Sequence, residues 1–533
     1  MPAADRLHVN RARLLPWLAV ALVVLATALL RIHLIDTPLE RDEGEYAYAG
    51  QLMLQGIPPY QLACNMKLPG TYAAYAVILA AFGQTITAIH AGLLLINAGS
   101  IVLIYLLGRR LFSVYAGLAS CAAYALLSVG AGVLGTQAHA THFVVLAALA
   151  GLLLLLRHDE SARPWTLLCS GILFGLAFLM KQHGVFFGLF GAAYLVGTGR
   201  WKKLPLFLAG AAAPFGLTCL ILWRAGVFDQ FWFWTFTYAR HYVSESSLSE
   251  GVAALAETFG PILRQSAGLW LLAAAGLVLL VRRAPSPARA SLVRLSKAGL
   301  AGVDRDAGFF LPALLVFSFA AVCPGLYFRA HYVVLMLPAV ALLAGSCVRG
   351  RISGWLFAAA LVASVVTQRD FLFRLSPVEI SRELYGLDPF PEAIRMAAYI
   401  RNHTAPNSLI AVLGSEPEIY FYAHRHSAIS YLYTEPLVEP QPFALTMQND
   451  MVRQLEQTAP QYVVRFPIEE TLSLAPQSPT RIYDWWAGYG PQHYQLVGIA
   501  DILPDGRTVY RWDAAAEAYQ PKSLYHLAVY RRK

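Results

Sequence analysis

Four acidic side chains lie close together in the first polar stretch of the sequence. The segment PLERDEGEY places Glu40, Asp42, Glu43 and Glu45 directly after the first long apolar block. A carboxylate that is partly shielded from water is less stable in its charged form, so its pKa rises and it becomes a better proton acceptor. We therefore infer that Asp42 or Glu43 acts as a general base toward the hydroxyl of an acceptor molecule.

The same acids also fit a structural role. Asp42 and Glu45 have the spacing of a capping box, and acids in a first helical turn interact favourably with the helix dipole. The two explanations are compatible, because the positive end of a helix is also a natural place to hold an anionic group. Capping alone stays open as an alternative to catalysis.

Residues that can neutralise a phosphate group follow in two places. Lys67, in the segment NMKLPG, lies later in the same loop, and its compact ammonium suits a phosphate. Arg329, His331 and Tyr332, in YFRAHYVV, begin a later apolar block and offer a second cationic contact. The alternatives are a lysine that reaches the lipid headgroups and an Arg–Tyr pair that anchors a helix at the membrane interface.

His241 and the sequence Lys181-Gln182-His183 are further polar candidates. His241 ends an aromatic segment and is a candidate for substrate contact, although an ordinary interfacial histidine explains it as well. The sequence has no cluster of His, Cys and Asp at recognisable ligand spacing, so we predict no metal ligands. The polar break at residues 181–183 separates two apolar blocks, where a span boundary is a sufficient explanation.

The composition indicates that lipid surrounds much of the chain. The sequence is 57% hydrophobic and 14% charged, whereas soluble domains are about 45–50% apolar and roughly 25% charged. Its apolar residues come in blocks near the ~20 residues that cross a bilayer core. The net charge of +9 does not indicate nucleic acid, because no basic stripe alternates with aromatic residues.

The apolar blocks predict about eleven membrane-spanning helices with a cytoplasmic N-terminus. Basic residues gather in alternate gaps, including the run 282–307, and the positive-inside rule places those gaps in the cytoplasm. The two short blocks beside Lys181 also fit one broken hairpin. The predicted spans are 14–34, 85–107, 113–131, 139–156, 164–180, 184–198, 204–223, 266–281, 308–324, 331–348 and 351–367.

The remaining segments are expected outside the cytoplasm. They include the first outside loop, 36–83, and the stretch 224–265. Within them, residues 71–83 are too short to span, and 228–242 has the aromatic density of a helix at the membrane surface.

The sequence beyond residue 368 predicts a separate domain. We divide the sequence into a transmembrane domain, 1–368, and an α/β domain, 369–533. Periodicity in the second domain predicts helices at 391–403 and 446–458, and strands at 409–413, 429–433, 462–465 and 524–530.

Three short elements together resemble the GT-C superfamily of membrane glycosyltransferases, specifically the bacterial aminoarabinose transferase and protein O-mannosyltransferase group (glycosyltransferase 39-like). They are the Asp42-Glu43 pair with Tyr46-Ala47, the Lys67-x-Pro69 element, and the stretch HYVVLMLPAVALLAG from His331 to Gly345. The arrangement of many spans followed by an outside α/β domain extends the likeness over nearly the whole chain. The resemblance implies a polytopic α-helical membrane fold with a C-terminal α/β domain.

The resemblance also implies a reaction. Such enzymes are inverting hexosyl- or pentosyltransferases with a polyprenyl-phosphate sugar as donor. By this likeness Asp42 is the base, Glu43 a supporting carboxylate and Lys67 the phosphate contact. The residues then assigned to substrate binding, besides Lys67, are Tyr46, His241, Arg329, His331 and Tyr332.

Cofactor and partners follow from the same likeness. The aminoarabinose enzymes have a metal-holding glutamate before the loop lysine, whereas this chain has Met66 there. We therefore assign no cofactor, and a divalent metal stays an alternative that Met66 disfavours. The expected partners are the lipid-linked donor, a glycolipid, polysaccharide or protein acceptor, and the lipid bilayer. The expected location is the bacterial inner membrane, with the C-terminal domain in the periplasm.

Two other classes of function stay open. A secondary transporter or lipid-linked glycan flippase with a periplasmic cargo domain would have inverted repeats, broken helices or buried charges along a path. We find no internal repeat, and most ionisable residues lie near the ends of the apolar blocks. A scaffold in an envelope-assembly complex would tolerate substitution of the loop acids but not loss of the C-terminal domain.

Overall fold

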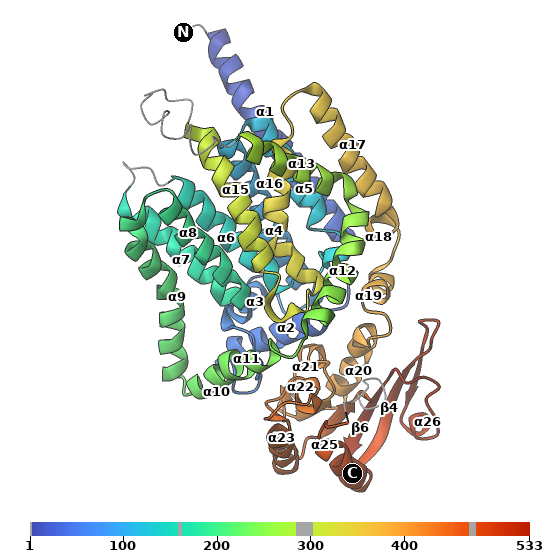
Figure 1. The fold of residues 1–533 in the computed structure, drawn as a ribbon. Helices are drawn as coiled ribbons and strands as arrows, with labels where there is room; N and C mark the ends of the chain where they lie inside the picture. The colour runs from blue at the N-terminus through green and yellow to red at the C-terminus, as the bar shows by residue number, and fades with distance from the viewer. Residues whose placement is uncertain (1–2, 158–162, 284–301, 468–475) are drawn as a thin grey trace. The chain divides into compact units, whose positions relative to one another are not determined.

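The computed structural model describes residues 3–157, 163–283, 302–467 and 476–533 (Figure 1). Internal contacts divide the chain into two units. The first, which we call the helical unit, comprises Met1–Leu34, His90–Cys219 and Val243–Arg374. The second, the α/β unit, comprises Ile35–Ile89, Leu220–Tyr242 and Leu375–Lys533. The first outside loop therefore packs with the C-terminal part of the chain rather than with the predicted spans.

A helix is present at each of the predicted spans. They are α1 (Ala3–His33), α4 (Ile86–Leu111), α5 (Val114–Leu127), α6 (Ala140–Arg157), α7 (Pro164–Met180), α8 (Val185–Gly197), α9 (Leu204–Arg224), α13 (Ala267–Arg283), α15 (Gly302–Ala320), α16 (Leu337–Ser346) and α17 (Arg351–Thr367). The stretch expected outside contains a further helix, α12 (Leu248–Gln265). Most of the basic run 282–307 lies outside the described residues.

Fewer of the described helices are long enough to span a membrane than the sequence predicted. Among the described residues, four helices are long and apolar enough to cross a membrane: Leu14–His33, Ile86–Leu111, Ala140–Arg157 and Trp201–Arg224. The pair α12 and α13, bent by 100° at a short break, would make a fifth. The other apolar helices have 10–17 residues. The structure therefore supports a polytopic helical fold without confirming eleven spans.

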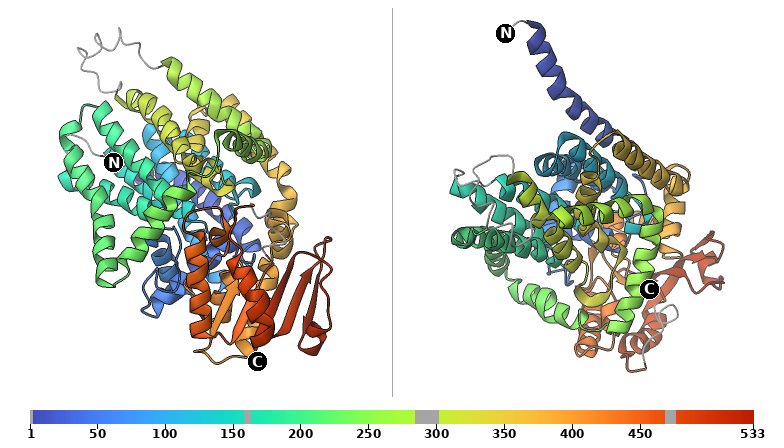
Figure 2. Two further views of the ribbon diagram at one scale, coloured as in Figure 1. Left: turned by 60° about the horizontal axis from the view of Figure 1, so that its bottom comes forward. Right: turned by 45° about the horizontal axis from the view of Figure 1, so that its top comes forward.

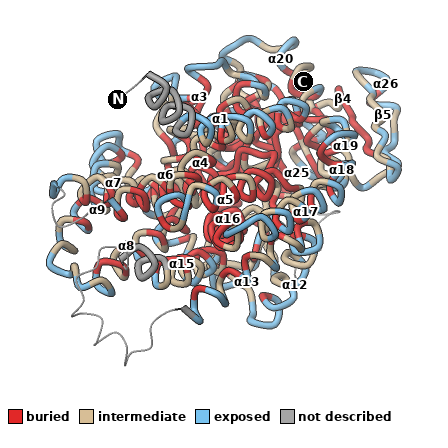
Figure 3. The backbone as a smooth tube through the Cα atoms, turned by 90° about the horizontal axis from the view of Figure 1, so that it is seen from above, coloured by how far each residue is buried: buried red, intermediate tan, exposed pale blue. Residues whose placement is uncertain are grey.

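Helices of the helical unit differ in what surrounds them. Every residue of α16 is buried, and α5 and α16 lie in the buried centre (Figure 3). By contrast, Leu22 on α1 is 66% exposed and Trp223 on α9 is 65% exposed. Large apolar side chains in contiguous exposed rows indicate a lipid-facing surface.

Small residues bring the central helices together. α5 packs against both α4 and α16. A Cβ atom on Gly117 of α5 would lie 2.7 Å from the carbonyl oxygen of Tyr105 in α4, and one on Gly345 of α16 would lie 2.7 Å from that of Ala116. Such close backbone approach is typical of helix packing in membranes, where small residues allow more dispersion contact.

The α/β unit contains two helices from the first outside loop and an aromatic segment. α2 (Arg41–Leu54) and α3 (Pro69–Phe82) come from the loop. The aromatic segment forms α10 (Phe228–Trp232), a π-helix (Phe233–Tyr238) and α11 (Ala239–Tyr242). Both segments that we expected to lie at the membrane surface are thus helical.

The C-terminal part of this unit is built on a six-stranded sheet with the order β2-β1-β3-β6-β4-β5 (Figure 2). β1 is parallel to β2 and β3, and the other pairs are antiparallel. The strands are β1 (Leu409–Leu413), β2 (His426–Ser427), β3 (Tyr462–Arg465), β4 (Tyr494–Ile502), β5 (Thr508–Trp512) and β6 (His526–Arg532). The helices are α19 (Pro377–Tyr385), α20 (Phe390–Asn402), α21 (Glu418–Ala423), α22 (Glu435–Val438), α23 (Ala444–Thr458), α25 (Arg481–His493) and α26 (Ala514–Glu517).

Most helices and strands predicted for the C-terminal part are present, but the prediction of a strand at 429–433 is wrong. β1 and β3 have the predicted bounds, β6 overlaps 524–530, and α20 and α23 match the two helices. Residues 429–433 form no strand of the sheet. The reason is that the backbone there meets the first outside loop instead, since Cys64 and Tyr431 form an isolated parallel bridge.

Candidate active site

The helix that carries the acids begins at Glu40. The Glu40 side chain accepts a hydrogen bond of 2.9 Å from the backbone N–H of Glu43, and the Glu43 carboxylate accepts one of 3.4 Å from the backbone N–H of Glu40. These bonds form a capping box. The predicted box of Asp42 and Glu45 is therefore wrong by two residues, and Asp42 lies in the first turn of α2.

Lys67 joins two acids of α2. Its ammonium donates to Asp42 Oδ1, and it also donates to Glu45 Oε2 at 2.6 Å. The same nitrogen forms ion pairs with both carboxylates. Residues separated along the loop thus converge on one cation, and the acid that shares Lys67 with Asp42 is Glu45 rather than Glu43.

Glu45 is the most extensively bonded acid in this cluster. Asn65 Nδ2 donates to its Oε2 at 2.7 Å, and the Tyr433 hydroxyl donates to the same oxygen at 2.6 Å. The Tyr72 hydroxyl donates to Oε1. Because the Glu45 side chain has no exposed surface, these donors and Lys67 replace the water that the carboxylate has lost.

Aromatic rings flank the ammonium. Lys67 Nζ lies 4.9 Å from the ring centroid of Tyr46 and 5.4 Å from that of Tyr433. Tyr46 in turn packs edge-on against Tyr75 of α3, with ring centroids 5.3 Å apart. Cation–π attraction in a desolvated setting adds about 2 kcal/mol at most to the ion pairs.

The local charges keep Lys67 protonated. Burial by itself would lower the pKa of the ammonium, but the carboxylates of Asp42 and Glu45 outweigh burial, so the pKa lies above its ordinary value of 10.5. The pKa of Glu40 is raised well above 4.5, first by burial and then by the charges of Asp42 and Glu43. Lys67 is therefore a cation at neutral pH, and Glu40 takes up a proton at a higher pH than an ordinary glutamate does.

Solvent reaches only part of the cluster. The side chains of Asp42 and Lys67 are 21% and 18% exposed, whereas Glu43 and Glu45 are fully buried. A hydroxyl arriving from solvent meets Asp42 before it meets the other two acids. The geometry thus offers one accessible carboxylate beside one accessible cation.

Comparisons with known proteins bear on the fold that carries this cluster. A family model described as dolichyl-phosphate-mannose-protein mannosyltransferase matches residues 67–223, so the match begins at Lys67. No curated protein sequence matches the chain. ArnT from Cupriavidus metallidurans, in its crystal structure bound to undecaprenyl phosphate, is similar with a TM-score of 0.61 and 14% identity, over 96% of this chain and 97% of ArnT. The chain has the fold of ArnT.

A second solved structure supports the same assignment. The Archaeoglobus fulgidus oligosaccharyltransferase in its apo form is similar with a TM-score of 0.52 and 14% identity, over 95% of this chain and 75% of that protein. At this identity the likeness concerns the fold. The likeness of fold extends over nearly the whole chain, as the coverage of 96% and 95% shows.

The remaining predicted site residues lie in both units. In the α/β unit, His241 packs edge-on against Phe443, with ring centroids 5.3 Å apart. In the helical unit, the exposed Arg329 guanidinium lies 5.4 Å from the ring centroid of Tyr327. Each of these two side chains thus packs on an aromatic ring.

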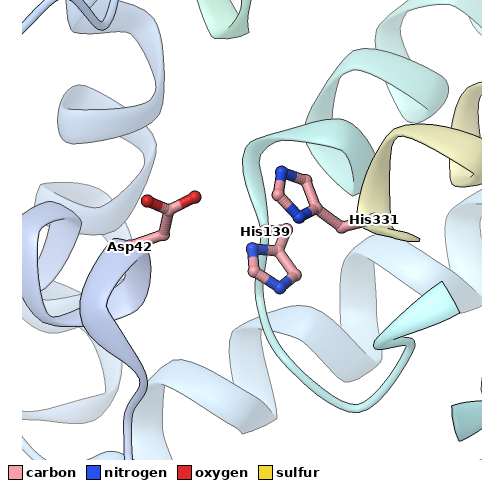
Figure 4. Close-up of side chains that lie close together, drawn as sticks. All are labelled: Asp42, His139 and His331. Carbon is pink, nitrogen blue, oxygen red and sulfur yellow. The ribbon is translucent and has the colours of Figure 1, made fainter. Parts of the chain in front are cut away.

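His331 and Tyr332 belong to a buried aromatic and cationic cluster of the helical unit. The rings of His139 and His331 stack face to face with centroids 4.1 Å apart (Figure 4, which also labels Asp42 of the other unit). Tyr332 contacts His183 at 4.4 Å between ring centroids, and the Lys181 ammonium lies 4.5 Å from the Tyr332 centroid. The polar break at residues 181–183 thus packs against the segment that begins the tenth predicted span.

Several residues of the candidate site were not selected from the sequence. Glu45 was considered only as a cap, and Asn65, Tyr72 and Tyr433 were not considered. Asn65 had a local signal, because it lies two positions before Lys67 in a short polar segment. Tyr433 had none, since it joins the cluster from 366 positions along the chain from Lys67.

The residue before Lys67 in the first outside loop does not favour a divalent metal. The residue before Lys67 is Met66, whose thioether is a poor ligand for a hard divalent cation. In the helical unit, the stacked imidazoles of His139 and His331 offer nitrogen atoms of the kind that transition metals prefer.

Proposed function

We propose that this protein is a membrane glycosyltransferase that moves a sugar from a polyprenyl-phosphate donor to a hydroxyl of an acceptor. The observation that carries the proposal is the Lys67–Asp42 ion pair, in which an accessible carboxylate lies beside an accessible cation. The GT-C fold supports it, and so does ArnT, a structure of similar fold that binds undecaprenyl phosphate. A carboxylate can serve such a transfer as a general base, and a cation can stabilise the departing phosphate.

The proposed reaction is a single displacement. Asp42 accepts the proton of the acceptor hydroxyl, and the hydroxyl oxygen forms a bond to the anomeric carbon of the sugar. The bond between that carbon and the phosphate oxygen breaks, and its electron pair leaves with the polyprenyl phosphate. Because attack and departure occur on opposite faces, the anomeric configuration inverts.

Lys67 has two roles in this scheme. Without donor, its ammonium compensates the charges of Asp42 and Glu45. A donor phosphate competes for the same ammonium, and a phosphate that has gained it becomes a better leaving group. Asp42 then loses a neighbouring positive charge, which raises its pKa and makes it a stronger base. Donor binding thereby activates the base.

The other candidate residues support these two. Glu43 fixes the first turn of α2 through the capping box, which orients Asp42. Tyr46 packs beside Lys67 and is suited to contact the sugar or the phosphate. We assign His241, Arg329, His331 and Tyr332 to substrate binding on the family resemblance.

The proposed setting is a bacterial inner membrane. The N-terminus is cytoplasmic, and residues 1–368 form the transmembrane domain with the first outside loop at 36–83. Residues 369–533 form a periplasmic α/β domain. A donor that already carries its phosphate needs no nucleotide at the outer face, and the acceptor is a glycolipid, a polysaccharide or a protein.

The first test is the identity of lipids that copurify with the protein. We would purify the full-length protein gently in detergent and identify its retained lipids by mass spectrometry. The wild type is expected to retain polyprenyl phosphate, with or without a sugar, and Lys67→Gln is expected to be depleted of it. Lys522→Ala is a matched control, because Lys522 is exposed in the α/β unit and lies outside the cluster.

If no lipid copurifies with the protein, the second test is a direct binding measurement. Undecaprenyl phosphate would be added back to the wild type and its binding measured. If the wild type retains no such lipid and also fails to bind the added one, the proposal is wrong. A transporter or flippase would then be the better explanation, and movement of a lipid-linked glycan in vesicles would be the next assay.

A further inference from the structure

We infer that Tyr433, from the C-terminal part of the chain, is a positioning residue that sets how strongly Glu45 holds Lys67. This inference rests on the proposed function and deepens it, because it ties the C-terminal part directly to the donor site. Tyr433 follows β2 and lies in a segment that the sequence suggested was a strand. Its side chain is 9% exposed.

The hydroxyl of Tyr433 lies at the centre of the cluster. It donates to Glu45 Oε2 at 2.6 Å and lies 3.2 Å from the backbone oxygen of Arg41. Lys67 Nζ lies 3.4 Å from the same hydroxyl, and Asn65 shares Glu45 Oε2 with it. One hydroxyl is therefore within reach of both members of the Lys67–Glu45 ion pair.

The backbone places Tyr433 there through the first outside loop. The N–H of Cys64 donates to the carbonyl oxygen of Ser430 at 2.8 Å, and Cys64 pairs with Tyr431 in an isolated bridge. This pairing fixes the backbone at Ser430, three residues before Tyr433. It explains why residues 429–433 leave the sheet.

The preceding residues of the C-terminal part hold α2 as well. We call residues 415–433 the clamp segment. The Arg41 guanidinium donates through Nε to the backbone oxygen of Ser415 at 2.9 Å, and the N–H of Ser427 donates to the Tyr48 hydroxyl at 2.7 Å. Contacts along the whole clamp segment therefore fix the helix that carries Asp42 and Glu45.

The physical effect of Tyr433 follows from competition for Lys67. Glu45 is fully buried, so its charge must be satisfied by hydrogen-bond donors and by Lys67. Each neutral donor that bonds to Glu45 reduces the share of its charge that Lys67 must compensate. Removal of the Tyr433 hydroxyl leaves Lys67 more tightly held by Glu45 and less available to a phosphate.

The test is a binding measurement on the full-length protein in detergent with undecaprenyl phosphate as the probe. Tyr433→Phe is expected to weaken binding by about 10- to 150-fold, as for loss of one hydrogen bond to a charged group. Turnover at saturating donor is expected to change less than the apparent KM. Tyr431→Phe is the control, because the Tyr431 hydroxyl donates to Asp450 and not to Glu45.

A double variant separates positioning from a general loss of structure. Glu45→Gln removes the charge that traps Lys67, so Tyr433→Phe should cost less binding in the Glu45→Gln background than in the wild type. The shifts in melting temperature should likewise be non-additive. They are compared among the wild type, the two single variants and the double variant. Equal losses in both backgrounds, or additive melting shifts, would overturn the role of Tyr433.

The outcomes also separate this inference from the proposed function. If the wild type binds undecaprenyl phosphate and Tyr433→Phe binds it equally well, the positioning role is wrong and the proposed function stands. If the wild type does not bind it, the proposed function fails. The non-additivity of the melting temperatures then still decides whether Tyr433 and Glu45 are coupled.

Discussion

The ammonium of Lys67 lies 2.6 Å from Oε2 of Glu45, a carboxylate with no exposed surface. A buried carboxylate that loses its cation keeps an uncompensated charge, which is costly in a medium of low dielectric constant. The pair is therefore structural, and under the proposed function substitutions at either residue are expected to affect both stability and donor binding.

Lys67→Ala is expected to destabilise the protein. Breaking a buried ion pair by removing one partner costs about 3–5 kcal/mol, and the partial exposure of Lys67 places the loss at the lower end. A second change, Glu45→Gln, removes the stranded charge and should restore part of the melting temperature. The check is thermal unfolding of the single and double variants, and an unchanged melting temperature in Lys67→Ala would contradict the ion pair.

Asp42→Asn is expected to lower glycosyl transfer by roughly 10²- to 10⁴-fold, the usual range for loss of a general base. Folding should be retained, because the amide keeps the size of the side chain and its acceptor oxygen. The matched control is Asp36→Asn, since Asp36 bonds to Thr87 in the same unit and lies outside the cluster. Full transfer by a folded Asp42→Asn protein would exclude Asp42 as the base.

Glu416→Gln is expected to remove part of the pH dependence of stability. Burial, the largest effect, raises the pKa of Glu416 from 4.5 to about 7, although the nearby Arg41 opposes it. The folded protein binds this proton more tightly than the unfolded chain does. The resulting stability, roughly 3 kcal/mol at most, is complete below about pH 4.5 and is lost as the pH rises through about 7.

The measurement is the melting temperature of both proteins from pH 5 to pH 8. Relative to Glu416→Gln, the wild type should lose stability with rising pH. Glu416 Oε2 accepts a bond of 2.7 Å from the N–H of Ser415, which the glutamine oxygen can preserve. Parallel pH curves for the two proteins would show that Glu416 does not titrate in this range.

Gly44→Ala is expected to destabilise the α/β unit without altering any acid. A Cβ atom on Gly44 of α2 would lie 2.6 Å from both the backbone nitrogen and the Cβ of Glu418 in α21. Overpacking of this kind costs about 1–3 kcal/mol, and it shifts α2 with the acids that it carries. The melting temperature and the transfer activity should therefore both fall.

Gly488→Ala is the control for that substitution. Gly488 lies in α25, and the space around its added Cβ is open. Alanine there should be neutral or slightly stabilising, because it favours the helix. Equal effects at Gly44 and Gly488 would show that the close approach of α2 to α21 has no energetic consequence.

The sequence by itself determined the local features of this protein. Apolar blocks predicted the positions of the long helices, because a segment surrounded by lipid must be apolar and must satisfy its own backbone hydrogen bonds. Short, nearly continuous apolar runs with β-branched residues predicted β1 and β3, whose central residues are buried on both faces. The acids of α2 and Lys67 were candidates because their residue types and loop position could be read directly.

Only the tertiary structure decided which of these residues meet. Glu45 rather than Glu43 pairs with Lys67, since Glu40 starts α2 and takes Glu43 as its capping partner. Tyr433 joins the cluster from far along the chain. Periodicity reports only local backbone preference, whereas the pairing of the first outside loop with residues 415–433 depends on packing between distant segments. That packing turned a predicted strand at 429–433 into part of the site.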